Sequence, residues 1–144
     1  MKVLLALEKL LERYPIEQIT AGRLGREAGI SRSTFYRQYS SVDDVLVQLF
    51  DHVIDEMVVV GDGWISGTDP LLQPSLRGVH EVFLHHGLLL RAVVDAQVGD
   101  LTATSKRYRG AMAMWDEAVS LRLQESYPWV PQPDLIAHAL NAAD

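Results

Sequence analysis

A polar stretch at residues 31–38 holds the side chains best suited to chemistry. Two arginines, Arg32 and Arg37, stand there among hydroxyl and amide side chains. Guanidinium groups form paired hydrogen bonds with phosphate oxygens and guanine edges, and hydroxyl and amide groups bond to phosphates or bases. The stretch therefore has the chemistry of a nucleic-acid contact surface.

The remaining reactive side chains form no recognisable catalytic or metal-binding pattern. His85 and His86 follow His80 by five and six residues, a spacing that does not stack side chains on one helical face. The adjacent His80 and Glu81 lack the second histidine of a zincin motif. The chain has no cysteine, and no serine–histidine–acid group or phosphate-binding glycine loop stands out. We therefore predict no enzyme activity, no cofactor and no metal.

Two short helices are predicted to position the polar stretch. Thr20 offers a hydroxyl N-cap for a helix over residues 20–28. Gly29 follows and ends that helix, because glycine tolerates the left-handed conformation of a tight turn. Ser31 then caps a second helix over residues 32–38. Two short helices joined by such a turn are typical of a helix-turn-helix, whose second helix enters the major groove of DNA.

The second helix has the two faces that this role requires. Phe35 and Tyr39 are four residues apart, so they share the face that would dock on neighbouring helices. The opposite face would present hydrogen-bonding groups to DNA. That face is predicted to carry Arg32, Ser33, Thr34, Arg37 and Gln38.

Amphipathic helices are predicted along the rest of the chain. In residues 1–14, Val3, Leu7 and Leu10 recur at spacings of four and three, and Pro15 ends the segment. Further helices are predicted at residues 41–60, 75–86, 88–97, 101–126 and from 134 onward, with a linker at residues 61–74 and a proline-rich break at residues 127–133. No strand-like alternation is present, so the predicted fold is all-α.

The helices divide into a three-helix helix-turn-helix domain of residues 1–41 and a helical body of residues 42–144. Because the last helix has no stop signal before Asp144, we expect the chain to be C-terminally incomplete. With 48% apolar residues the body can bury a core. Its apolar runs fall short of the roughly 20 residues that span a bilayer. We expect no membrane contact and a cytoplasmic location.

Charge is unevenly distributed along the chain. The net charge is −6 over 144 residues, which by itself argues against nucleic acid as a partner. Within residues 20–39, however, Glu27 is the only acid. The same segment carries Arg23, Arg26, Arg32 and Arg37. A basic patch on an acidic body is the layout expected when one small face meets phosphates.

This segment resembles the signature of the TetR family of transcriptional regulators. The similar residues are Ile19-Thr20, Leu24 and the run Ala28-Gly29-Ile30-Ser31-Arg32-Ser33-Thr34-Phe35-Tyr36-Arg37-Gln38-Tyr39, and the resemblance extends over residues 3–49. It implies that Thr20 and Tyr36 contact phosphates. It also implies that bases or backbone are met by Ser31, Arg32, Ser33, Thr34 and Arg37.

Some of these assignments have alternatives. Tyr36 could instead be a core aromatic with its hydroxyl at the surface. Arg23 and Arg26 could form a solvated face rather than contact DNA. The family usually has a lysine, which steadies a phosphate, where this chain has Val42. Its absence should weaken DNA affinity without abolishing it.

The body resembles the branch of the TetR family typified by the ethionamide-resistance repressor. The anchors are residues 87–96, the Met112-x-x-Trp115 pair and Leu140-Asn141. The resemblance implies a ligand-binding and dimerisation domain with a narrow hydrophobic tunnel and an asparagine as polar handle. If this chain has the same tunnel, the resemblance implies a lining of Leu76, Val79, Phe83, Tyr108, Met112, Trp115 and Asn141. Helical spacing lets these rows face one cavity, although ordinary core packing would give the same pattern.

The combined interpretation is a homodimeric repressor that binds a pseudo-palindromic double-stranded DNA operator. The family dimerises through its last two helices. A small hydrophobic effector entering the body would tilt the helix of residues 41–60 and release the operator. The alternative is a helical ligand sensor or adaptor that keeps the TetR fold without binding DNA, which Val42 and the acidic balance would permit.

Overall fold

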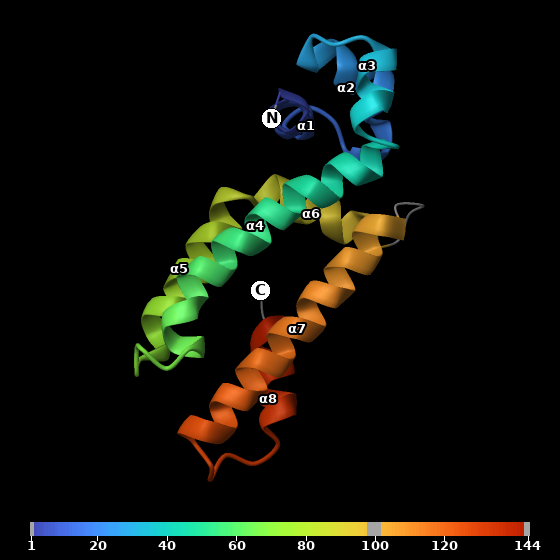
Figure 1. Cartoon of the computed structure of the whole chain (residues 1–144). Helices are drawn as coiled ribbons and strands as arrows, with labels where there is room; N and C mark the ends of the chain where they lie inside the picture. The colour runs from blue at the N-terminus through green and yellow to red at the C-terminus, as the bar shows by residue number, and fades with distance from the viewer. Residues whose placement is uncertain (1, 98–101, 143–144) are drawn as a thin grey trace. The chain divides into compact units, whose positions relative to one another are not determined.

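The computed structural model describes residues 2–97 and 102–142, with side chains up to residue 140. This part of the chain contains α-helices, one short 3-10 helix and no strand (Figure 1), which confirms the all-α prediction. The helices are α1 Lys2–Leu11, the 3-10 helix η1 Ile16–Gln18, α2 Ala21–Ala28, α3 Arg32–Gln38, α4 Val42–Ile65, α5 Leu72–His85, α6 Gly87–Asp95, α7 Thr102–Ser126 and α8 Pro133–Ala142. None of the described helices has the length and apolar content of a bilayer-spanning segment.

The helices form two compact units. Unit 1 comprises the described residues of Met1–Val53 and His85–Arg107, and unit 2 those of Ile54–Leu84 and Tyr108–Asp144. The two long helices α4 and α7 each begin in unit 1 and end in unit 2. Unit 1 is therefore larger than the predicted helix-turn-helix domain, because it also holds the first half of α4 and all of α6.

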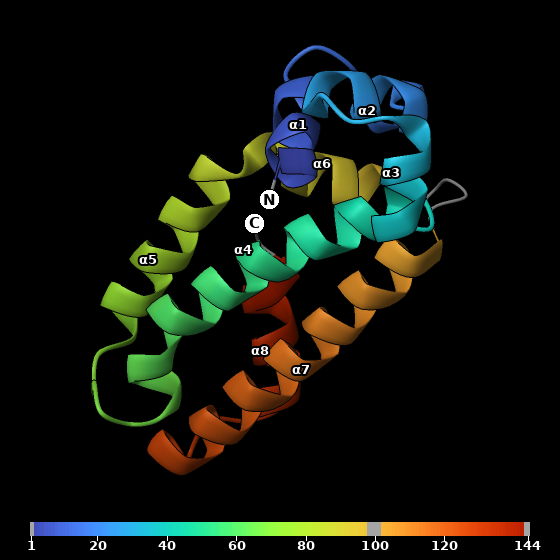
Figure 2. The same ribbon diagram turned by 45° about the horizontal axis from the view of Figure 1, so that its top comes forward.

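Unit 1 has its core where α1 meets α2 and α6 (Figure 2). The predicted inward side chains of α1, Leu7 and Leu10, are buried at 0% and 2% exposure, and Leu24 of α2 is also fully buried. Phe35 and Leu46 complete this core from α3 and α4. Each such side chain contributes roughly 1.5–3 kcal/mol through its removal from water. The core thus fixes α2 and α3 on a rigid base.

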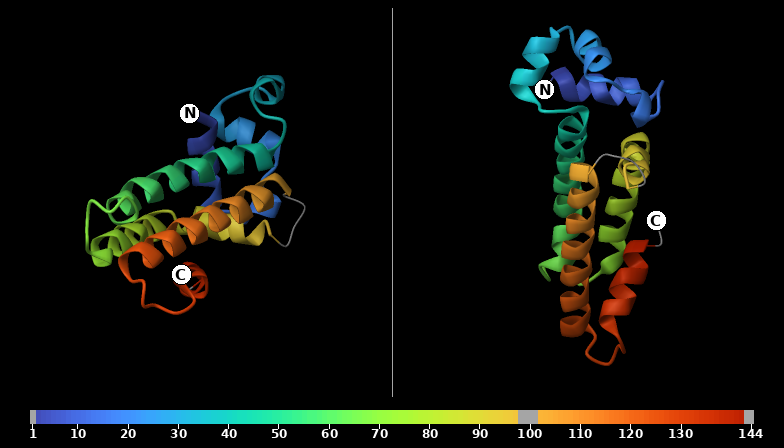
Figure 3. Two further views of the ribbon diagram at one scale, coloured as in Figure 1. Left: turned by 60° about the horizontal axis from the view of Figure 1, so that its bottom comes forward. Right: turned by 90° about the vertical axis from the view of Figure 1, so that its right-hand side faces the viewer.

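Unit 2 is built from the second half of α4, α5, most of α7 and α8. Figure 3 shows α8 running beside α7, and two side-chain contacts join them: Ser120 with Asp134, and Asp116 with His138. The core cluster of unit 2 consists of Trp64, Val119, Leu123 and Ala137, with Ile65, Leu72, Trp115, Tyr127 and Ile136 packed against it.

The predicted linker at residues 61–74 is wrong at both ends, because α4 continues to Ile65 and α5 begins at Leu72. Gly61 sits where an added Cβ would lie 2.8 Å from the Trp115 ring. The glycine therefore permits close packing rather than breaking the helix. Trp64 is 2% exposed, and the Arg122 Nε donates a hydrogen bond to its carbonyl at 2.8 Å. Tertiary contacts thus extend the helix past a sequence rich in glycine.

Candidate nucleic-acid interface and ligand pocket

The α2–α3 turn has the predicted caps. The Thr20 Oγ1 accepts a hydrogen bond from the backbone N–H of Arg23 at 3.2 Å, and the Ser31 Oγ accepts one from the N–H of Thr34 at 3.1 Å. Gly29 lies between them with φ +68°, in the left-handed region that glycine adopts without strain. Its N–H bonds back to the last turn of α2. Caps of this kind contribute about 0.5–2 kcal/mol each.

Helix α3 separates into an apolar and a polar face. Phe35 is fully buried and Tyr39 is 9% exposed, with their ring centroids 5.6 Å apart. The other face is open to solvent. It exposes Arg32, Ser33, Tyr36, Arg37 and Gln38. This is the division of faces that a recognition helix requires.

Local contacts order the polar face. The Arg37 Nη2 donates to the Thr34 Oγ1 at 3.1 Å. The Ser31 hydroxyl is 2.9 Å from the hydroxyls of Ser33 and Thr34. These bonds hold donors and acceptors in one exposed row, so less side-chain entropy is lost when a partner binds.

Pairing of the only acid in residues 20–39 leaves the surface basic. The Arg13 Nη2 donates to the Glu27 carboxylate at 2.8 Å, and this hydrogen bond raises the pKa of Arg13. The Arg23 guanidinium stacks 4.0 Å above the Tyr14 ring, so Arg23 has a packing role, whereas Arg26 is exposed. The exposed arginines of the candidate interface are therefore Arg26 of α2 and Arg32 and Arg37 of α3.

The positions of Tyr36 and Val42 concern two alternatives left open by the sequence: whether Tyr36 is a core residue, and what the loss of the family lysine does. Tyr36 is 48% exposed, and its ring stands nearly perpendicular to the buried Phe35 ring, with 5.3 Å between the centroids. The Arg32 guanidinium lies 5.6 Å from the Tyr36 ring centroid. Tyr36 is thus at the surface, where a phosphate contact stays a prediction. Val42 is the first residue of α4.

The start of α4 holds a residue whose role the sequence reading missed. Asp43 is 9% exposed, and its carboxylate accepts hydrogen bonds from the N–H groups of Ala103 and Thr104 at 2.8 and 3.0 Å. The Thr104 hydroxyl donates to the same carboxylate. Asp43 therefore caps the first turn of α7, where a negative charge also favours the helix dipole. A second tie joins Asp51 to Arg107.

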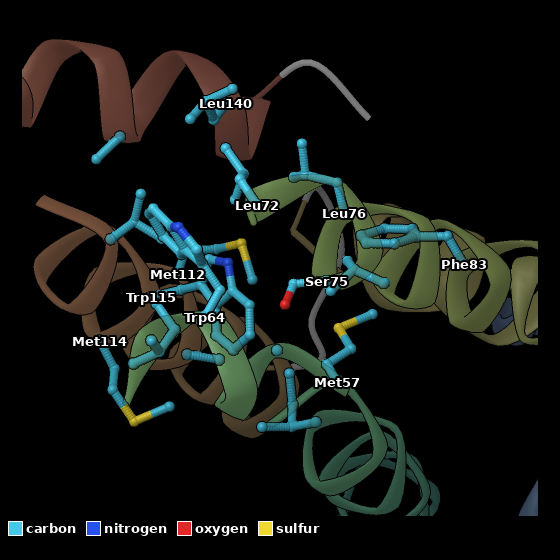
Figure 4. Close-up of a pocket in the computed structure, with 17 residues that line it drawn as sticks. Met57, Trp64, Leu72, Ser75, Leu76, Phe83, Met112, Met114, Trp115 and Leu140 are labelled. Atoms are coloured by element: carbon cyan, nitrogen blue, oxygen red, sulfur yellow. The ribbon is translucent and has the colours of Figure 1, made fainter. Parts of the chain in front are cut away.

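Unit 2 encloses an apolar pocket among α4, α5, α7 and α8 (Figure 4). Its free volume of about 70 Å³ suits several waters or a slender organic molecule, since one water needs roughly 10–15 Å³. Of the predicted lining residues, the structure brings together Leu76, Val79, Phe83, Met112 and Trp115.

Two predicted lining residues stand apart from this group. Tyr108 is half-buried in α7 and is not among the described residues around the pocket. Asn141 belongs to α8, but its side chain lies outside the described part of the chain. Binding of a ligand by any of these seven residues stays a prediction.

The sequence reading missed several residues around the pocket. Trp64 and Leu72 fell within the predicted linker, although the apolar pair Trp64-Ile65 in that segment was a signal of packing. Met57 of α4 also lines the pocket. Ser75 adds a hydroxyl to the lining. The described residues contain no cluster of histidine, aspartate or glutamate arranged to hold a metal.

Comparisons with known proteins give matches both in sequence and in fold. No protein-family model matches the chain. A 54-residue segment, 38% of the chain, is 41% identical to the HTH-type transcriptional regulator EthR of Mycobacterium tuberculosis strain H37Rv and of strain CDC 1551. The matched segment is 25% of the length of these relatives.

The fold is shared with two solved structures. A Pseudomonas aeruginosa PAO1 protein assigned as a transcriptional regulator is 18% identical, with a TM-score of 0.77 over 98% of this chain and 73% of that chain. A Clostridium perfringens protein assigned as a fatty acid metabolism regulator is 14% identical, with a TM-score of 0.63 over 97% of this chain and 79% of that chain. At these identities the likeness is one of fold.

Proposed function

We propose that this chain, which is TetR-like in a segment of its sequence and in its fold, binds operator DNA through α3 and represses transcription. The observation that carries the proposal is the exposed polar face of α3, fixed by the buried Phe35 and by the Ser31 cap. Arg32 and Arg37 would supply contacts to phosphates and guanine edges. Thr20, Ser31, Ser33, Thr34 and Tyr36 would add hydrogen bonds.

The second part of the proposal is that a small apolar effector enters the pocket of unit 2. The lining from Leu76, Phe83 and Trp115 gives such a molecule apolar contacts. Burial of its surface would supply most of its affinity. The effector releases DNA only if it favours a conformation whose α3 is misplaced for the groove.

A homodimer would place two α3 helices in successive major grooves, one helical turn apart. The proposed binding to operator DNA takes place in the bacterial cytoplasm. Light scattering coupled to size-exclusion chromatography tests the assembly directly. A mass of twice 16.1 kDa is expected for the dimer, and a mass of one chain would contradict it.

The DNA proposal is tested by fluorescence anisotropy with a labelled fragment of the DNA upstream of the gene. We expect tight binding whose affinity falls steeply as salt rises, because each neutralised phosphate releases counterions. The double variant Arg32→Ala, Arg37→Ala should lose affinity by about 10-fold or more, since each base contact is worth roughly 1–3 kcal/mol, and should show a shallower salt dependence.

A matched control removes the same charge elsewhere. Arg77 and Arg109 are exposed arginines of unit 2. Arg77→Ala, Arg109→Ala should leave the affinity within about 2-fold, because salt screens exposed charges that make no direct contact with DNA. Equal losses in the two double variants would show that only net charge matters. Weak binding unaffected by either would favour the second candidate, a helical sensor without DNA binding, to which Val42 at the start of α4 points.

A further inference from the structure

The pocket of unit 2 contains a buried hydrogen-bond donor without a partner. Trp64 is 2% exposed, and no described protein atom accepts a hydrogen bond from its indole Nε1. A buried N–H that has left water is costly unless an acceptor meets it. Since Trp64 lines the pocket, a bound molecule could provide that acceptor.

A second polar group lies close by in the lining. Ser75 is 7% exposed, and its hydroxyl oxygen points into the pocket from α5 (Figure 4). Apart from Ser75 and the indoles of Trp64 and Trp115, the described lining consists of glycine and of hydrocarbon, aromatic and thioether side chains. It contains no charged residue.

We propose that the pocket selects a slender, uncharged apolar molecule with one hydrogen-bond acceptor, a carbonyl or ether oxygen, which accepts a hydrogen bond from Trp64 Nε1. The Ser75 hydroxyl donates a second bond to the same oxygen. This inference rests on the proposed effector role of the pocket and names its ligand class.

The uncharged character of the ligand follows from the lining. A carboxylate brought into this pocket would lose its water without meeting a cationic side chain among the described lining residues, and that desolvation opposes binding. A pure hydrocarbon would leave the indole N–H unpaired, so it would gain contact area but no hydrogen bond. Sites that hold an unpaired polar group discriminate strongly against analogues that lack its partner.

Calorimetry on the full chain with three eight-carbon probes tests the inference. The probes are 2-octanone, octanoate and octane kept below its aqueous solubility. We expect 2-octanone to bind most tightly. Trp64→Phe should lower the affinity for 2-octanone by about 2- to 12-fold, the usual net contribution of a hydrogen bond. The affinity for octane should stay nearly unchanged. Trp129→Phe is the matched control, because Trp129 is 79% exposed.

Other outcomes overturn the inference in distinguishable ways. If octanoate binds more tightly than 2-octanone, or if Trp64→Phe leaves 2-octanone unaffected, the ligand class is wrong while the pocket still binds effectors. If none of the probes binds, the effector role of the pocket fails with it, and DNA binding by α3 is unaffected. Circular dichroism checks that Trp64→Phe folds. If Trp64→Phe does not fold, Ser75→Ala replaces it as the test, and this variant should also lower the affinity for 2-octanone.

Discussion

Asp43 connects the beginnings of two long helices through a single carboxylate. Its two oxygens accept bonds from the first turn of α7, while the neighbouring Asp44 bonds to the N–H of Ser40 at 2.9 Å, and the N–H of Asp44 donates to Ser41 at 3.1 Å. The two acids therefore stabilise different parts of the structure. Asp44 fixes the start of α4 next to the end of α3, and Asp43 binds that start to α7 within unit 1.

Replacement of Asp43 by asparagine should destabilise the protein. The amide keeps the shape, but its single oxygen can accept from only one of the two N–H groups of Ala103 and Thr104, so its NH2 group faces the other donor. The change also removes the charge that favours the α7 dipole. We expect a loss of about 1–3 kcal/mol in the free energy of unfolding, measured by urea denaturation. Asp55→Asn, an exposed change of equal charge on the same helix, should cost less than about 0.5 kcal/mol. Similar losses for both would rule out the capping role.

The elements that the sequence predicts best are α2 and α3, because their signals are local. The signals lie within a short stretch of sequence: a hydroxyl cap, a glycine that adopts the left-handed conformation, and apolar residues spaced four apart. The end of α4 and the partner of Asp43 depend instead on contacts with α7, some 50 to 60 residues away. No local pattern in the sequence marks such contacts, so the end of α4 was misplaced and the cap of α7 was missed.

The candidate site divides in the same way. The polar residues of α3 share a face by helical periodicity, so sequence alone could group them. Leu76 and Phe83 of α5 and Trp115 of α7 come together only because both helices line one pocket in the folded chain, and their grouping was inferred from family resemblance. Trp64 was expected to pack but was placed in a linker, because the glycines beside it favour one, whereas Gly61 admits the Trp115 ring.

At the scale of the turn, Gly29 offers a clean test of backbone conformation. Cβ atoms added at Gly29 and at Gly110 both meet open space, but Gly29 has φ +68° whereas Gly110 lies inside α7. Gly29→Ala should therefore cost about 1–2 kcal/mol. Gly110→Ala should stabilise by about 0.5–1 kcal/mol, because alanine loses less entropy in a helix. Thermal denaturation of both variants decides the matter, and stabilisation by Gly29→Ala would contradict it.

At the scale of the whole molecule, α4 and α7 are the helices common to both units. Each is tied to the other within unit 1 by Asp43 and Arg107, and each lines the pocket within unit 2 through Met57, Trp64 and Trp115. A ligand that changes the packing of these helices in unit 2 therefore acts on helices that also have residues in unit 1, the unit that contains α3. Coupling requires that the ligand and DNA favour different states of these helices.

Asp43→Asn should then reduce the coupling between ligand and DNA. The quantity to measure is the factor by which saturating 2-octanone weakens DNA binding in anisotropy titrations, which for coupled sites is typically about 5- to 150-fold. Loss of the Asp43 bonds should bring this factor toward one while leaving the affinity for 2-octanone itself within about 2-fold, because Asp43 is not among the lining residues. Asp55→Asn should keep the wild-type factor. An unchanged factor in Asp43→Asn would mean that the signal reaches α3 without the carboxylate that joins α4 to α7.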